Sequence, residues 1–151
     1  MTSEATDDAF YNKAVSLIKY GSILQVVILV VHYITGMDAN LYVVIPADNP
    51  LSILFQWQSF GLLLHIITGF LVLIIEVVML YYSVKIRQRT FWIMNLVNVI
   101  LVGLAIHAGA EFYLYGQDAG YSLWMAILYI AVVVVDFAQY VLVRERLLNK
   151  L

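Results

Sequence analysis

Cysteine is absent from this 151-residue sequence, and charged residues make up only 12% of it. Without cysteine the chain can have no disulfide framework, no cysteine-ligated metal site and no iron–sulfur cluster. It has eight basic and ten acidic residues and no basic stripe, so nothing points to a nucleic-acid partner. The N-terminus is acidic and lacks the features of a cleaved signal peptide, so we expect the first apolar segment to be retained.

Apolar residues, in contrast, make up 64% of the chain and lie in long runs. Soluble domains contain roughly 45–50% apolar residues, and a helix needs about 20 of them to cross a bilayer. Four segments are long enough, at about residues 15–36, 59–82, 91–114 and 121–143. The sequence therefore predicts an all-α fold, in which residues 1–151 form a single four-helix transmembrane bundle surrounded by lipid.

The basic residues indicate how this bundle is oriented. With four spans, all of them fall on one side of the membrane: Lys13, Lys19, Lys85, Arg87, Arg89, Arg144, Arg146 and Lys150. The opposite loops contain no Lys or Arg and carry Asp38, Asp48 and Asp118. The positive-inside rule then predicts a multi-pass protein with both termini in the cytoplasm, in the plasma membrane if the source is prokaryotic.

Several polar residues interrupt the predicted spans, and polar groups at membrane depth usually face a bundle interior or a cavity. Four of them fall in the cytoplasmic half: Glu76, Asn95, Asp136 and Gln139. They are candidates for a proton route or a quinone-head site, and Glu111 is a further candidate carboxylate nearer the outer side. The alternative is a hydrogen-bonded cluster with a purely structural role. On the third span, Asn98 lies on the face opposite His107 and is expected to serve another contact.

The three histidines lie in the outer half of the spans. His65 is 21 residues before Ile86, and His107 is 21 residues after it. Because Ile86 is the middle of a short turn, the two imidazoles lie at one height, ~23 Å from the inner surface. Glycine occurs four residues from each histidine: Gly61 and Gly69 flank His65, Gly103 precedes His107, and Gly36 follows His32. These glycines open the helix face directly above or below the imidazole. Such a slot suits a flat macrocycle with axial histidine ligands.

A structural reading of these residues stays open. Glycine is frequent in membrane helices because it allows close packing, and a lone membrane histidine often donates a hydrogen bond to a neighbouring helix. His32 is a third candidate, which replaces one member of the His65/His107 pair, orients a ligand or lines a quinone pocket.

The segments GLLLHIITG and GLAIHAG, around His65 and His107, resemble those of small four-helix membrane b-type cytochromes, with the bacterial cytochrome b561 type as the nearest comparison. The resemblance covers about half of the chain. It implies haem b held between histidines of neighbouring helices, and we carry over only the ligand role of His65 and His107. Since two such haems need four histidines, it implies at most one haem here.

The leading hypothesis is therefore a haem-dependent electron-transfer subunit or oxidoreductase that passes electrons between a quinone-type carrier and a partner protein. Two alternatives stay open. One is a cofactor-free accessory subunit of a larger respiratory or transport complex, or a homodimer, whose polar residues contact partner helices. The other is a proton or small-solute carrier that uses His32, His65, Glu76 and Asp136 as a relay.

Overall fold

The computed structural model of the protein describes residues 2–46, 48–115 and 117–148, and these residues form helices and loops without a β-strand. Four long α-helices account for most of them: α1 (Thr2–Tyr42), α2 (Phe60–Lys85), α3 (Arg89–Leu114) and α4 (Ala119–Leu148). Each covers one of the predicted spans to within one residue. Two short 3-10 helices, η1 (Pro50–Phe55) and η2 (Trp57–Ser59), precede α2.

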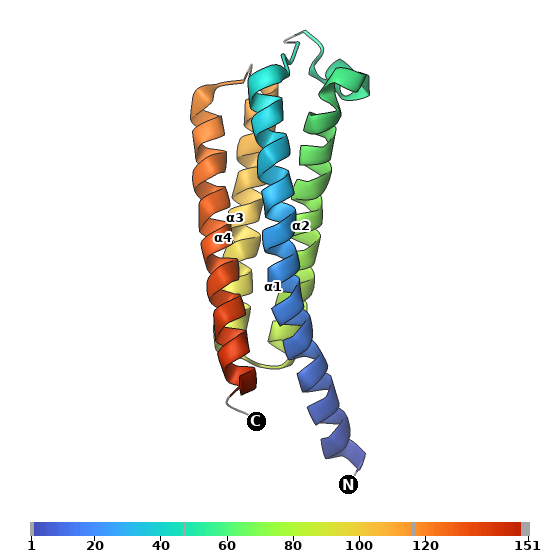
Figure 1. Cartoon of the computed structure of the whole chain (residues 1–151), viewed down its shortest axis with the longest axis vertical. Helices are drawn as coiled ribbons and strands as arrows, with labels where there is room; N and C mark the ends of the chain where they lie inside the picture. Colours follow the sequence, from blue (N-terminus) through green and yellow to red (C-terminus); the bar gives the residue numbers. More distant parts are fainter. Residues whose placement is uncertain (1, 47, 116, 149–151) are drawn as a thin grey trace.

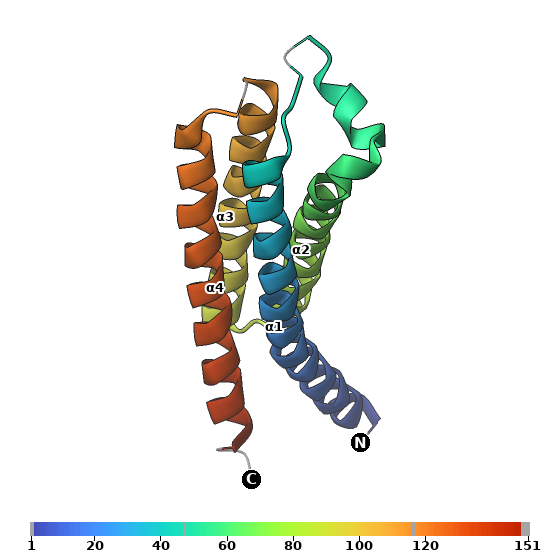
Figure 2. The same cartoon turned by 45° about the horizontal axis from the view of Figure 1, so that its top comes forward.

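The four helices pack as an up-and-down bundle (Figure 1). Each helix packs along the next one in the chain, and α4 closes the ring against α1. All four are long and apolar enough to cross a membrane. The 41 residues of α1 would span about 60 Å, and its first turns extend below the other helices in Figure 1 and diverge from the bundle in Figure 2.

The bundle interior is built in layers, one helical turn apart. One apolar layer takes a buried residue from each helix: Leu29, Val72, Val102 and Val132. Four residues away on each helix, toward the N-terminus in α1 and α3 and toward the C-terminus in α2 and α4, the interior becomes polar, in two successive layers. The first contains Gln25, Glu76, Asn98 and Asp136, and the second contains Ser22, Met79, Asn95 and Gln139, all fully buried. The 3.6-residue period of the helix thus brings one face of each helix into every layer.

We call one end of the bundle the basic end, because it holds the α2–α3 turn with Lys85, Arg87 and Arg89, and the C-terminal turns of α4 with Arg144 and Arg146. Arg146 donates a hydrogen bond to Gln88, and its guanidinium carbon lies 4.7 Å from the ring centre of Phe91. A buried apolar cluster of Val15, Ile18, Phe91 and Val143 fills the interior here. Lys150 lies outside the described residues.

The other end, the loop end, is closed by the connection between α1 and α2 (Figure 2). Val43, Ile45 and Ile53 from this connection are buried against Ala39, Leu62 and Phe112 of the helices. The Gln117 side chain holds the connection in place, because its amide nitrogen donates to the Val43 carbonyl at 2.7 Å and its oxygen accepts from the Ile45 N–H at 3.1 Å. The interior at the loop end is therefore covered.

Candidate functional site

The two polar layers form one hydrogen-bonded cluster at the centre of the bundle. Asn98 lies in its middle, where its side-chain nitrogen donates to Glu76 Oε1 at 2.8 Å and to Asp136 Oδ1 at 2.9 Å. Gln25 donates a further hydrogen bond to Glu76 Oε1. The carboxyl groups of Glu76 and Asp136 are therefore close together, because both accept from the same Asn98 nitrogen. Three N–H groups and two carboxyl groups from four helices thus meet in one layer.

The second polar layer is organised by the side-chain amide of Gln139. Its nitrogen donates to Ser22 Oγ at 3.1 Å and to Asn95 Oδ1 at 3.0 Å, and it lies 3.9 Å from the sulfur of Met79. Asn95 in turn donates to the carbonyl oxygen of Phe91, one turn earlier in α3. This layer connects all four helices, but unlike the first it contains no ionisable group.

The cluster has more hydrogen-bond acceptors than donors. Five buried side-chain oxygens have no hydrogen-bond partner in the described structure: Gln25 Oε1, Glu76 Oε2, Asn98 Oδ1, Asp136 Oδ2 and Gln139 Oε1. No ion pair from Lys, Arg or His reaches either carboxyl within the described residues. Burial of such oxygens without a hydrogen-bond donor costs free energy. Binding of a proton or of a small hydrogen-bond donor would lower this cost.

The second group of interest is a pair of stacked imidazoles on α1 and α2. The ring centres of His32 and His65 lie 3.8 Å apart, with 16° between the ring planes. His65 Nδ1 lies 2.9 Å from the carbonyl oxygen of His32, and His32 Nδ1 lies 2.9 Å from Thr68 Oγ1. The Thr68 hydroxyl proton is directed to the carbonyls of Leu64 and His65, so this hydroxyl accepts from His32.

These hydrogen bonds fix the same tautomer for both rings. A carbonyl oxygen can only accept, and the Thr68 oxygen has already used its proton, so each Nδ1 carries a hydrogen. Each Nε2 therefore carries a lone pair in the neutral ring, and the described residues provide no hydrogen bond to it. A lone pair of this kind can accept a hydrogen bond from a hydroxyl or bind a metal.

Glycine makes room for the stacked pair, but in a different way from that expected. A Cβ added to Gly36 would lie 2.7 Å from Cε1 of His65, and one added to Gly69 would lie 3.2 Å from Cε1 of His32. The notch beside each glycine is thus occupied by the imidazole of the opposite helix. Gly61 packs closely against the Asp38 carboxylate, whereas Gly103 has nothing within 4 Å of an added Cβ.

A cavity of about 330 Å³ adjoins the imidazole pair and is lined by all four helices. Its floor is the apolar layer of Leu29, Val72, Val102 and Val132, and its roof includes Ala39, Leu62 and Phe112 from the cluster at the loop end. The walls are mainly apolar, with polar groups contributed mostly by aromatic side chains and the histidines: His32, Tyr33, His65, Tyr113 and Tyr129. Its volume is within the range of small-molecule sites in proteins.

His107 does not belong to this cavity. Ile106 and Gly109, on either side of it, line the cavity, whereas the side chain of His107 is 71% exposed on the outside of α3. There it lies 3.9 Å from the carboxylate of Glu111, which is itself separated from the central cluster. The structure thus joins Glu76, Asn95, Asp136 and Gln139 and leaves Glu111 and His107 elsewhere.

A haem held between His65 and His107 does not fit this arrangement, because the two side chains do not face a common space. A haem between His32 and His65 does not fit either, since their rings are in direct stacking contact. Among the described residues, no group of three or more His, Asp or Glu is placed to hold a metal ion, which is a separate question from haem, whose iron takes at most two protein ligands.

Sequence reasoning did not include Gln25 and Asn98 in the site, although both are central to the cluster. The spacing of polar residues on α3 could have indicated that Asn98 faces the interior. Asn95, Asn98 and Val102 follow the three- and four-residue spacing of one helix face, and His107 falls on the opposite face. Two amides on one face indicate a polar interior contact more strongly than one histidine on the other. Which face turned inward was decided by pairing with Glu76 and Asp136.

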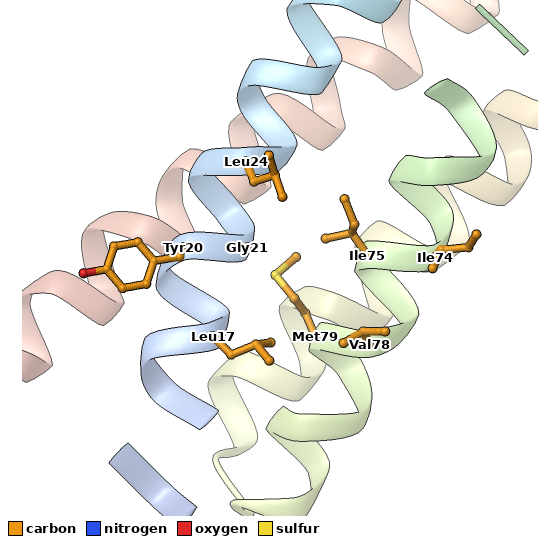
Figure 3. Close-up of a pocket in the computed structure, with 8 residues that line it drawn as sticks. All are labelled: Leu17, Tyr20, Gly21, Leu24, Ile74, Ile75, Val78 and Met79. Atoms are coloured by element: carbon orange, nitrogen blue, oxygen red, sulfur yellow. The ribbon is translucent and has the colours of Figure 1, made fainter. Parts of the chain in front are cut away.

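A second, shallower cavity of about 300 Å³ lies between α1 and α2 near the basic end (Figure 3). Its lining is almost entirely apolar, and the Met79 side chain points across it toward Gly21. The Tyr20 hydroxyl points away from it (Figure 3). Without a polar group to orient a ligand, this groove is not a candidate site.

Replacing Gly36 by alanine tests the stacked pair. The added methyl group would overlap His65, so we expect a loss of about 1–3 kcal/mol of stability, typical of overpacking. Gly103→Ala is the matched control, because its methyl group meets no neighbour and alanine is the better helix former by up to about 1 kcal/mol. Thermal unfolding in detergent measures both. Equal melting temperatures for the two variants would contradict the stacked arrangement.

Replacing Asn98 by alanine tests the central cluster. The change removes two hydrogen bonds to carboxyl groups, and we expect it to cost about 1–3 kcal/mol of stability. Asn40→Ala, at an exposed position of α1, should change the free energy of unfolding little. The comparison can be made by unfolding both variants in mixed micelles. A neutral Asn98→Ala would mean that the carboxyl groups do not depend on this amide.

Known proteins provide no template for these two sites. No family model, curated protein or solved structure matches the chain. The resemblance of the segments around His65 and His107 to b-type cytochromes therefore stays a prediction.

Proposed function

We propose that this chain is the quinone-binding subunit of a membrane electron-transfer complex, and that the cavity beside His32 and His65 is the binding site. The observation that carries the proposal is that His32 and His65 line an apolar cavity of about 330 Å³, while the described residues provide no hydrogen bond to either Nε2. A quinol has a flat apolar ring and two hydroxyl groups that donate hydrogen bonds. Both features match this environment.

The chemistry suits the reduced form of the carrier. A quinol hydroxyl donates to Nε2 of His32 or His65, which holds the ring in the cavity and provides a base for the proton. Oxidation of one quinol to the quinone releases two protons and two electrons. The electrons pass to a redox centre of a partner protein, which is why we propose a subunit of a complex and not a self-sufficient enzyme.

A b-type cytochrome is the second candidate, and one observation favours it. The Nδ1–H of His65 donates a hydrogen bond to the backbone carbonyl of His32. Such a hydrogen bond often orients a histidine whose Nε2 binds a metal. In this form His65 or His32 would be a haem ligand, with His107 outside the site. The bundle would have to separate the stacked rings before a macrocycle could enter.

The membrane orientation is part of the proposal. The four apolar helices would cross the bilayer, with the basic end in the cytoplasm, because the described basic residues gather there and the loop end carries Asp38, Asp48 and Asp118. The cavity would then lie in the outer half of the membrane, where a quinone can reach it from the lipid. The exposed large apolar side chains along all four helices support this immersion.

The ligand is tested with the purified chain, by its optical spectrum and by titration with short-chain quinols. We expect no Soret band and saturable quinol binding. His65→Ala should weaken quinol binding about tenfold, which corresponds to 1.4 kcal/mol, and His32→Ala should have a similar effect. His107→Ala is the matched control and should bind quinol as the wild type does, because this ring lies outside the cavity.

Three outcomes would contradict parts of this proposal. A Soret band lost in His65→Ala would establish the cytochrome instead. Loss of the same band in His107→Ala would restore the ligand pair predicted from sequence. If His32→Ala and His65→Ala both bind quinol with wild-type affinity, the cavity is not the binding site.

Orientation is tested by cysteine labelling, for which the cysteine-free chain is an ideal background. A membrane-impermeant maleimide should label Asp118→Cys in intact cells. It should label Arg87→Cys, in the α2–α3 turn, only after the membrane is opened. The unmodified chain should not react at all. Labelling of Arg87→Cys in intact cells would reverse the assignment.

A further inference from the structure

Glu76 and Asp136 are the buried ionisable pair that the quinone proposal does not use. We infer that these two carboxyl groups share one exchangeable proton and form a proton-accepting site at the centre of the bundle. This inference is independent of what the cavity binds. It rests on the amide nitrogen to which both carboxyl groups bond, on their full burial and on the acceptor oxygens left without a partner.

The closeness of the two groups requires a proton. Both side chains are fully buried, and both accept a hydrogen bond from the same Asn98 nitrogen, at 2.8 Å for Glu76 Oε1 and 2.9 Å for Asp136 Oδ1. A carboxylate oxygen can only accept, so the two groups can share a hydrogen bond only when one of them is protonated. Two adjacent negative charges in a dry interior would also repel strongly, with no basic side chain among the described residues to offset them.

Amide N–H groups stabilise the one negative charge that remains on the pair. With one proton shared, the pair carries one negative charge, and it receives three N–H donors from Gln25 and Asn98. All three go to Glu76 Oε1 and Asp136 Oδ1, so Glu76 Oε2 and Asp136 Oδ2 have no amide donor. These two oxygens are where the shared proton lies and where a second proton can bind. Charge-assisted hydrogen bonds of this kind stabilise a buried anion.

The layers around the pair favour one direction of exchange. Toward the cavity lies the dry apolar layer of Leu29, Val72, Val102 and Val132. Toward the basic end lies the second polar layer, where Gln139 Oε1 is another acceptor without a partner. One turn further, Ser83 of α2 is buried at the level of the apolar cluster around Phe91. Polar groups thus continue on this side as far as the apolar cluster around Phe91, whereas the cavity side begins with an apolar layer, and we therefore assign proton exchange to the basic end.

Infrared difference spectroscopy of the full-length protein tests the shared proton. At neutral pH we expect the carbonyl band of a protonated carboxyl group, and we expect this band to shift after transfer to D2O, as protons exchange. The band should disappear or move in both Glu76→Gln and Asp136→Asn, and it should be unchanged in Glu111→Gln. Exchange should be slower in Gln139→Leu than in Asn40→Leu if the second polar layer is the route.

Isotope labelling of the wild-type protein provides the same test without a substitution, so it applies even if a variant fails to fold. In the wild-type protein, carboxyl-13C labelling of aspartate and of glutamate should each shift the same band, because the proton is shared. Absence of a protonated carboxyl band, or a band that neither label moves, would overturn the inference. A band that does not exchange in D2O would identify a purely structural hydrogen bond and would likewise overturn it.

Discussion

Hydrogen bonding among buried polar side chains is the constraint on which this bundle depends. Apolar layers above and below separate the centre from solvent, so each polar group there must be satisfied by another helix. Asn98 meets this requirement for two carboxyl groups at once, and Gln139 does so for a serine and an asparagine. These bonds set the rotation of all four helices, because a fully paired polar network is more specific than apolar contacts alone.

The rotation of α3 has a direct consequence for function. Turning Asn95 and Asn98 inward turns His107 outward, since the two faces lie on opposite sides of the helix. The histidines that stay together are those of α1 and α2, where each imidazole fits into the notch of a glycine on the opposite helix. The central cluster therefore selects which imidazoles face the cavity, although it does not touch them.

The bundle separates two kinds of chemistry by one apolar layer. On one side, the cavity provides an apolar wall with nitrogen lone pairs, which suits a flat ligand with hydroxyl groups. On the other side, the cluster provides carboxyl and amide oxygens, which suit protons. Leu29, Val72, Val102 and Val132 keep the two apart by about one helical turn.

The sequence by itself determined the number of helices, their approximate ends and the gathering of the described basic residues at one end, because hydrophobic length and charge are properties of single segments. It also brought Glu76, Asp136, Asn95 and Gln139 to similar depth, since depth follows from residue count. It could not decide which face of α3 turns inward, nor that Gly36 and Gly69 receive imidazoles and not a macrocycle. Those outcomes depend on pairing between helices, and only the tertiary structure contains that information.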